Sequence, residues 1–387
     1  MAIGKQTFQF FIPNVSIMGV GCHVEVAEQL LSRDCKRPLI VTDKGITGLG
    51  MTELFVNLFK EADIEAVVYD DAVPNPTDVC VMSGVDVYKK GNCDSIVTIG
   101  GGSSHDCGKG IGTVATNGGI INDYEGVDKL SKRMPTFVAI NTTAGTASEM
   151  TRFCIITDTS RHVKMAIIDW RVTPDAAVND PELMTGMPPS LTAATGMDAL
   201  THAVEAYVST IATPITDACA LQAIELVATY LRAAVANGQD MEARDKMAYA
   251  EYLAGMAFNN ASLGHVHAMA HQLGGLYNLP HGVCNAILLP HVERFNLIAK
   301  LDRFADIAVA MGENIEGLTT REAADVAIDS ITTLSKDVGI PANLTELGVK
   351  EEDLKTMAEN AQKDACGLTN PRTPTLQDVI NIYKAAL

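Results

Sequence analysis

The sequence is poor in aromatic residues, in positive charge and in long apolar runs. Aromatic residues make up 5% of 387 residues, and Lys and Arg number 29 against 47 Asp and Glu, a formal net charge of −18. Proteins that bind a phosphate backbone need clustered Lys and Arg, so nucleic acid is not an expected partner. The sequence has no run of about eighteen apolar residues, so no membrane span is expected. A small-molecule substrate fits this composition best.

The cysteines also lack any paired pattern. There are nine of them, an odd number, and none are spaced C-x-x-C. This indicates reduced thiols in a reducing compartment and excludes a zinc ribbon. The first 21 residues contain one Lys, and Gln, Pro and Asn interrupt their apolar residues, which is not the pattern of a signal peptide. We therefore expect a cytoplasmic protein.

The first half of the chain alternates apolar runs with helix-like segments of 10–15 residues. This alternation predicts a parallel sheet with helical crossovers, buried on both faces. A hairpin is expected near 153–170, within "FCIITD" and "KMAIIDW". The expected strands of the parallel sheet lie at 38–43, 64–71, 94–104 and 135–143.

The pattern changes after "NDPELMTGMPPS" at 179–190, where Ala-, Leu- and Met-rich helical segments take over. The Pro-Pro pair at 188–189 is the expected boundary. We predict a Rossmann-like, mostly parallel α/β domain over residues 1–185 and an all-helical domain over 186–387. The length also favours two domains.

A glycine turn, Gly100 to Ser103, follows the third expected strand and precedes a helix. Glycines let the backbone approach a ligand, and the helix N-terminus favours phosphate, so the turn can bind a pyrophosphate. The alternative is a tight turn without a ligand. It is not a Walker A loop, because five residues separate Gly102 from Gly108, and Gly110 stands where Ser or Thr would hold Mg²⁺.

Two further features lie at the same expected sheet edge, where α/β proteins bind ligands. "NTTAGTASE" at 141–149 places small and hydroxylated residues after the fourth strand. Asp43 ends the first strand, where a carboxylate can bind the 2′-OH of a ribose and repel a 2′-phosphate. An ordinary helix N-terminal residue is the other interpretation of Asp43.

Histidine and aspartate recur at helical spacing in the second half. Asp198 and His202 are at i and i+4, as are His267 and His271, and His281 follows shortly after. One Asp and three His form an oxygen–nitrogen set that Zn²⁺ or Fe²⁺ accepts with a position open for substrate. Spacing alone does not decide between His267 and His271. His265 is about 200° from His267 around a helix and cannot face the same ion.

Seven motifs along nearly the whole chain together resemble the iron-containing (group III) metal-dependent alcohol dehydrogenases. The similarity is greatest to their NAD-dependent branch, which acts on 1,3-propanediol, lactaldehyde and methanol. Ser104 and Gly108 stand where relatives commonly carry Pro and Ala, a difference that bears on fine specificity. The motifs are "VTDKG" (41–45), "PNPT" (74–77), "GGGSSHDCGKGI" (100–111), "NTTAGTASEMT" (141–151), "KMAIID" (164–169), "GMDALTHAVEAYVS" (196–209) and "VHAMAHQLGGLYNLPHGVCNAILLPHV" (266–292).

The resemblance implies a dehydroquinate synthase-like fold, bound NAD and one divalent ion, Fe²⁺ first, with Zn²⁺ and Mn²⁺ as alternatives. It implies that His271 lies beside the metal without being a ligand. The implied ligands are Asp198, His202, His267 and His281. The implied NAD contacts are Asp43, Asn75, Gly101, Gly102, Ser103, Asp106, Thr142, Thr143 and Lys164.

The resemblance also implies the reaction: a small primary alcohol or diol loses a hydride to nicotinamide from a metal-bound alkoxide, giving an aldehyde. Histidine titrates near neutrality, so His271 is the expected proton carrier, and Lys164 is expected to bind the nicotinamide ribose. A homo-oligomer, dimer or larger, is expected from the family.

Four other functions are alternatives to this interpretation. Two are enzymes of the same fold, of the dehydroquinate synthase and glycerol dehydrogenase types. A lyase of the first type needs basic residues for a phosphorylated substrate, and no such cluster lies near the expected ligands. The glycine turn and Asp43 argue against the third, a nucleotide-free hydrolase. A non-catalytic binding protein, the fourth, would not need four ligands and an open position.

Overall fold

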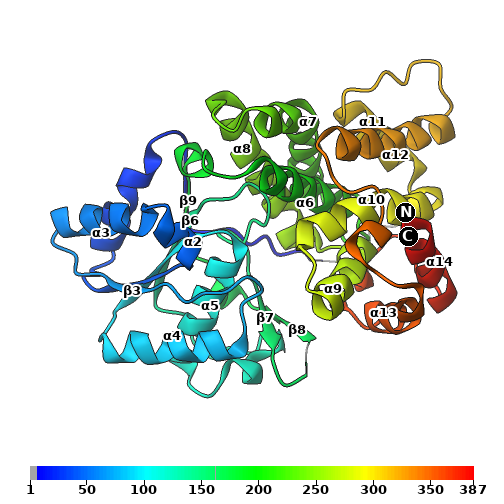
Figure 1. Cartoon of the computed structure of the whole chain (residues 1–387). Coiled ribbons are helices and arrows are strands. Elements are labelled where there is room, and N and C mark those ends of the chain that lie inside the picture. The colour runs from blue at the N-terminus through cyan, green and yellow to red at the C-terminus, as the bar shows by residue number, and fades with distance from the viewer. Residues whose placement is uncertain (1–6, 162) are drawn as a thin grey trace.

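A six-stranded, entirely parallel sheet forms the core of the first half of the chain (Figure 1), in a computed structural model that describes residues 7–161 and 163–387. The strand order is β1-β9-β6-β4-β2-β3. A second, three-stranded sheet has the order β5-β8-β7, and β7 and β8 form the expected antiparallel hairpin. The strands are β1 (Val15–Met18), β2 (Pro38–Val41), β3 (Val67–Tyr69), β4 (Ser95–Gly100), β5 (Gly126–Val127), β6 (Thr136–Asn141), β7 (Phe153–Asp158), β8 (Val163–Ile168) and β9 (Ala176–Asn179).

The predicted alternation of strand and helix is confirmed, and the reason is burial on both faces of the sheet. All residues of β2 and β4 are buried. One apolar cluster joins the sheet to α4 and α5, and another joins it to α1 and α3. The helices of this half are α1 (Val26–Leu31), α2 (Lys44–Gly48), α3 (Met51–Glu61), α4 (Asp78–Lys90) and α5 (Gly102–Asn117).

Three strands were not anticipated from the sequence: β1, β5 and β9. β1 and β9 have four residues each and pair with one another. β5 has two residues. β5 is too short for an apolar period to be recognised, a serine interrupts the apolar residues of β1, and "AAVN" in β9 is dominated by alanine, which does not favour strands. Pairing with neighbouring strands, rather than local propensity, therefore determines that these three strands form.

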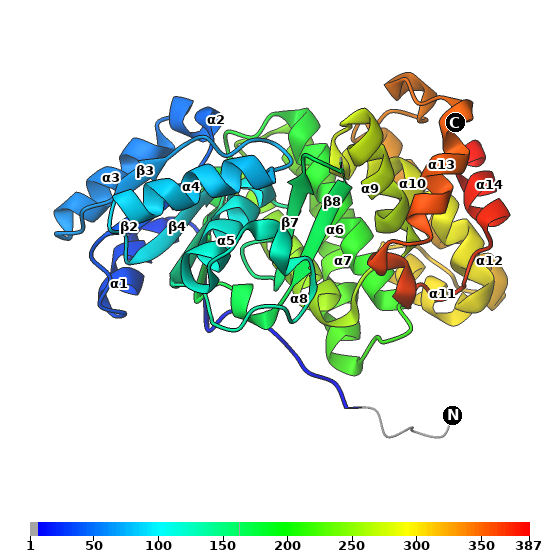
Figure 2. The same ribbon diagram turned by 90° about the horizontal axis from the view of Figure 1, so that it is seen from below.

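The second half is helical, as expected, and the described residues after β9 contain no further strand. These helices gather in the other half of the molecule (Figure 2), and their buried residues form one large apolar core. Among the described helices, α7 alone combines the length and apolar composition of a membrane span, and it packs against α6 and α8. The helices are α6 (Pro189–Val208), α7 (Pro214–Ala236), α8 (Met241–Ala261), α9 (His265–Tyr277), α10 (His281–Asn296), α11 (Leu301–Ala310), α12 (Thr320–Asp337), α13 (Leu354–Ala361) and α14 (Leu376–Ala386).

Close backbone contacts bring the carboxyl edge of the sheet against the helices. The loop after β6 lies on α6 and α8: a Cβ on Gly145 would meet Thr195 at 2.6 Å, and one on Gly255 would meet Ala147 at 2.5 Å. Glu251 of α8 accepts a hydrogen bond from Ala147 N (2.5 Å). The sheet edge and the helices that carry the predicted ligands therefore face each other.

Candidate metal and cofactor site

The glycine turn and the loop after β6 interlock at the carboxyl edge of the sheet. A Cβ on Gly101 would lie 2.9 Å from Thr143 Oγ1, and one on Gly102 would lie 3.0 Å from Thr146 Oγ1. Thr142 N donates to Gly100 O (3.0 Å). Ser103 lies in the first turn of α5, whose N-terminus opens at this edge. The structure thus brings five of the predicted cofactor residues together: Gly101, Gly102, Ser103, Thr142 and Thr143.

Asp43 lies on the neighbouring strand end and faces the glycine turn. It is the N-cap of α2, and its Oδ1 accepts from Gly45 N (2.7 Å) and Ile46 N (3.1 Å). Its Oδ2 lies 3.5 Å from Ser104 Oγ. Both interpretations of Asp43 are therefore compatible with its position, because one oxygen caps the helix while the other points to the turn.

Asp106 is placed differently from the other predicted cofactor residues. Its Oδ1 accepts from Ser148 Oγ (2.6 Å) and its Oδ2 accepts from Ile155 N (3.1 Å). Burial raises the pKa of this carboxyl, while the charges of Lys109 and Lys164 oppose that rise. Both oxygens are engaged within the protein, so Asp106 joins the turn to β7 from behind.

A cavity of about 290 Å³ lies between the two halves and contains the remaining two predicted cofactor residues, Asn75 and Lys164. Asn75 and Asn278 both have left-handed backbone angles, at φ 53°, and Asn75 Nδ2 donates to Asn278 Oδ1 (3.2 Å). Lys164 is partly buried, and burial lowers its pKa. A Cβ on Gly274 of α9 would lie 3.4 Å from Lys164 Nζ, so α9 passes directly beside the ammonium group.

Three of the four predicted metal ligands converge. Ligand atoms of Asp198 on α6, His267 on α9 and His281 at the first turn of α10 all lie within 4.8 Å of one another. His267 Nε2 and His281 Nε2 each lie 3.8 Å from Asp198 Oδ1. Two nitrogens and one oxygen in this arrangement suit a divalent transition metal.

A single amide lies among these ligand atoms. Asn285 Nδ2 is 2.6 Å from Asp198 Oδ1 and 3.1 Å from the Nε2 atoms of His267 and His281. An amide nitrogen carries two protons, so it cannot satisfy three acceptors at once. The surplus of lone pairs over donors is what a bound cation would satisfy, and the residues therefore fit a metal ion.

His202, the fourth predicted ligand, lies beside this group but not within it. Its ring stacks on His267, with centroids 4.6 Å apart at 17°, and on Phe258, with centroids 4.2 Å apart. Its buried Nδ1 has no hydrogen-bond partner among residues 7–161 and 163–387. An unpaired nitrogen this deep is costly unless it binds something, and a ligand role would remove the cost.

Burial sets the charge state of the ligands. It lowers the pKa of His202 to about 4. Burial together with the charge of His271 lowers the pKa of His267 well below its ordinary value, and burial together with Lys164 does the same for His281. Burial also raises the pKa of Asp198. Neutral imidazoles present free lone pairs, and a buried carboxylate is stabilised by a nearby cation, so both effects suit metal binding.

His271 belongs to a different cluster, although it is one turn from His267. Its Nδ1 pairs with Asp364 Oδ2 (2.8 Å), and it groups with Asp364 and Cys366. Its ring stacks on His281 with centroids 5.5 Å apart. His265 lies elsewhere, against Gly367 and with its backbone N–H donated to Asn370. The three histidines of α9 therefore lie in three different surroundings. Helical spacing alone did not decide between His267 and His271.

Three residues around these side chains were missed in the sequence. Asn285 is at i+4 from His281, and Glu205 is at i+7 from Asp198, so helical spacing could have drawn attention to both. Glu205 Oε2 pairs with His267 Nδ1 (2.5 Å). Asp364 lies 93 positions from His271 in a short 3₁₀ region, and no local pattern points to it.

Comparison with known proteins gives the family. Residues 13–181 match the model of iron-containing alcohol dehydrogenases, and residues 192–387 match the C-terminal model of the same family. Alcohol dehydrogenase 4 of Schizosaccharomyces pombe is 57% identical over 98% of this chain and 89% of its own length. NAD-dependent methanol dehydrogenase of Bacillus methanolicus is 52% identical over 98% and 99% of the two chains.

A solved structure of 1,3-propanediol oxidoreductase is 53% identical, with a TM-score of 0.97 over 99% of this chain and all of that one. The fold and the matched family define a nucleotide-dependent oxidoreductase built from an α/β half and a helical half. The chain belongs to the iron-containing alcohol dehydrogenase family. It is an enzyme that interconverts alcohols and aldehydes, as the resemblance implied.

Proposed function

We propose that this enzyme oxidises small primary alcohols or diols with NAD⁺ and reduces the corresponding aldehydes. One observation carries the proposal: ligand atoms of Asp198, His267 and His281 converge within 4.8 Å, and α9, the helix of His267, also borders the Lys164 cavity. The names of relatives that act on methanol and on 1,3-propanediol support a short substrate.

The proposed metal ligands are Asp198, His267 and His281, with His202 as the fourth. When bound, a divalent ion, Fe²⁺ in our proposal, supplies Lewis-acid polarisation of the substrate oxygen. The family name supports iron, and Zn²⁺ and Mn²⁺ are the alternatives to test. Asn75 and Lys164, which both line the cavity, would hold the nicotinamide end of NAD.

The proposed NAD contacts at the glycine turn are the residues that interlock there. Backbone N–H groups at the start of α5 would bind the pyrophosphate, since they have no partner within a helix. The Oδ2 of Asp43, which faces the turn at 3.5 Å from Ser104 Oγ, would bind a ribose hydroxyl and repel a 2′-phosphate. Asp106 would support the turn rather than contact NAD directly, because both of its carboxylate oxygens already accept hydrogen bonds within the protein. The remaining proposed contacts are Gly101, Gly102, Ser103, Thr142 and Thr143.

His271 is the proposed proton acceptor. Its Nδ1 pairs with Asp364 Oδ2, which favours a proton on Nδ1 and leaves Nε2 free to accept the proton of the substrate hydroxyl. The side chain is only partly buried, so the proton can pass on to solvent.

The direct test measures NADH absorbance with methanol, 1-butanol, 1,2-propanediol and 1,3-propanediol. The protein is used after chelation and after anaerobic reconstitution with Fe²⁺, Zn²⁺ or Mn²⁺. We expect turnover only in reconstituted samples and a preference for one short alcohol. Absence of metal-dependent NADH formation with every alcohol would contradict the proposal. The same assay on glycerol and on a phosphorylated substrate tests the two alternatives of the same fold.

We further propose that the enzyme is a cytoplasmic homo-oligomer and that residues 1–185 and 186–387 are its two domains. Light scattering on the purified protein tests assembly: a mass of two or more chains is expected, and 41.2 kDa would contradict it. Limited proteolysis tests the boundary, with cleavage expected near the Pro-Pro pair at 188–189.

A further inference from the structure

Glu205 is a buried carboxylate with no role in the mechanism above. It lies on α6 one turn beyond His202 and two turns beyond Asp198, so all three residues share one face of the helix. Only 1% of its surface is exposed. An isolated charge at such depth is costly, so its partners show what it is for.

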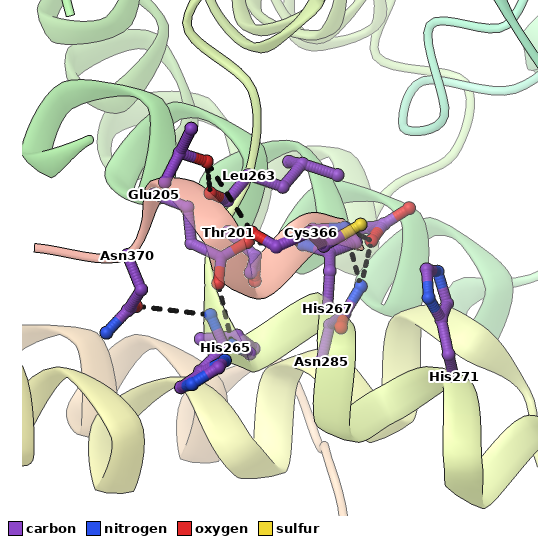
Figure 3. Close-up of polar contacts among 12 residues, drawn as sticks. Thr201, Glu205, Leu263, His265, His267, His271, Asn285, Cys366 and Asn370 are labelled. Atoms are coloured by element: carbon purple, nitrogen blue, oxygen red, sulfur yellow. Dashed lines mark hydrogen bonds and ion pairs between the residues drawn. The ribbon is translucent and has the colours of Figure 1, made fainter. Parts of the chain in front are cut away.

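The two carboxylate oxygens of Glu205 both contact the first turn of α9. Oε2 pairs with His267 Nδ1 at 2.5 Å, and Oε1 accepts from Val266 N at 2.7 Å. A Cβ on Gly264 would lie 2.7 Å from Oε1, so only glycine leaves the carboxylate room at this point. Figure 3 shows His267 and Asn285 between Glu205 on one side and His271 on the other.

The contact with Nδ1 fixes which nitrogen of His267 carries the proton. A carboxylate accepts, so Nδ1 donates and Nε2 keeps its lone pair. That Nε2 is the atom 3.8 Å from Asp198 Oδ1 and 3.1 Å from Asn285 Nδ2. The lone pair therefore faces the other proposed ligands. His271 is held from another direction by Asp364, a residue outside α6.

We propose that Glu205 is a positioning residue for the metal: its carboxylate orients His267 and supplies a second buried negative charge. This inference rests on the metal site proposed above. A divalent cation bound at the site would balance the two negative charges that Asp198 and Glu205 carry when both are ionised. Carboxylate–histidine pairs of this kind orient metal ligands and increase their basicity.

The test is metal affinity, measured on the folded protein by competition with a fluorescent chelator, using Zn²⁺ and then Co²⁺. We expect Glu205→Gln to raise the metal dissociation constant by about 10- to 100-fold and to shift the d–d absorption of bound Co²⁺. Glu205→Asp, which keeps the charge but shortens the side chain, is expected to weaken binding less. An affinity within threefold of the parent in folded Glu205→Gln would overturn the proposal.

Glu293→Gln is the matched control. Glu293 is a fully buried glutamate of the same helical half, and its hydrogen bond goes to Asn296 rather than to a proposed ligand. We expect its removal to leave metal affinity within threefold of the parent. An equal loss in both variants would overturn the proposal, since any buried charge would then serve.

A purely structural role has a different signature. If Glu205 served only to cap α9, Glu205→Gln would lower the melting temperature of the metal-free protein without changing its metal affinity, which also overturns the proposal. Should neither variant fold, the imidazole spectrum of the Zn²⁺-loaded parent decides. A downfield Nδ1–H signal from His267 supports the proposal, and a proton on Nε2 overturns it. Failure of the parent to bind metal would instead overturn the proposed site.

Discussion

At the scale of single residues, the contrast between His267 and His271 is the clearest result. They lie one turn apart on α9, yet each pairs with a different carboxylate, Glu205 or Asp364. The deeper histidine faces Asp198 and His281, and the other is partly exposed. The two side chains therefore differ in surroundings rather than in chemistry.

Replacing each histidine by alanine tests this division of roles. His267→Ala is expected to lose bound metal and all activity. His271→Ala is expected to keep one metal ion per chain while turnover falls by about 10²- to 10⁴-fold, the usual contribution of a general base. Elemental analysis and NADH formation on the same samples measure both. The reverse pattern would show that the two roles are exchanged.

Asp43 offers a second residue-scale test, of cofactor choice. Asp43→Gly is expected to improve the use of NADP⁺ by removing the charge that repels a 2′-phosphate, and it also removes the cap of α2. Asp43→Asn keeps a capping side chain, so it separates the two effects. We expect kcat/KM for NADP⁺ to rise at least about tenfold in both variants, a gain of about 1.4 kcal/mol. Unchanged cofactor preference would contradict the role.

Sequence alone could identify the candidate residues but not all their partners. Asp198 and His202, like His267 and His271, follow from helical spacing. The pairing of His271 with Asp364 spans 93 positions, and neither the residue types nor any helical spacing in the sequence indicates it. Resemblance to the family, rather than geometry, distinguished His267 from His271 in the sequence, and the structure adds a physical reason.

At the scale of elements, the start of α10 positions His281. Pro280 is the N-cap and Gly282 is the second residue of the helix. A Cβ on Gly282 would overlap the backbone carbonyl of Ala194 on α6. The two helices can approach closely only because position 282 is glycine, and that approach brings His281 to Asp198.

We therefore expect Gly282→Ala to separate α10 from α6. A backbone carbonyl cannot move aside as a flexible side chain can, so destabilisation of about 1–3 kcal/mol is expected, together with weaker metal binding. Urea unfolding and metal analysis measure the two effects. Gly186→Ala is the control, because a Cβ at 186 meets nothing within 4 Å. Normal metal affinity in folded Gly282→Ala would contradict this account of the helix contact.

Sequence predicts some elements better than others. The strands β2, β4 and β6 are four to six residues long and strongly apolar, which makes them recognisable between helices. β1 and β9 exist because they pair with each other at one side of the sheet, and pairing is not visible in either segment alone. Glycine positions such as 282 likewise acquire meaning only when the neighbouring helix is known.

At the scale of the whole molecule, a buried carboxyl pair joins the two halves. Glu251 of α8 accepts from Ala147 N in the loop after β6, and the carboxyl group of Glu149 lies close to it. Burial and the neighbouring Glu149 raise the pKa of Glu251 well above its ordinary value. The loop of predicted cofactor contacts is therefore tied to the helical half by a carboxyl group whose ionisation is disfavoured by folding.

This pair predicts how stability depends on pH. A carboxyl whose pKa is raised on folding contributes stability below its unfolded pKa, and that contribution is lost as pH rises through the folded value. The loss is about 1.4 kcal/mol for each pH unit over which only the folded chain keeps the proton. Glu251→Gln cannot ionise, so its melting temperature is expected to fall less between pH 6 and pH 9. Parallel declines in parent and variant would contradict the assignment.

The central claim is that one divalent ion, held by Asp198, His202, His267 and His281, is required for alcohol oxidation by NAD⁺. Titrating metal-free protein with Fe²⁺ under anaerobic conditions, while following NADH formation, tests this most directly. The account predicts a rate that rises with added metal and saturates at one ion per chain, and no response in His281→Ala. A rate independent of metal, or an equal response in His281→Ala, would contradict it.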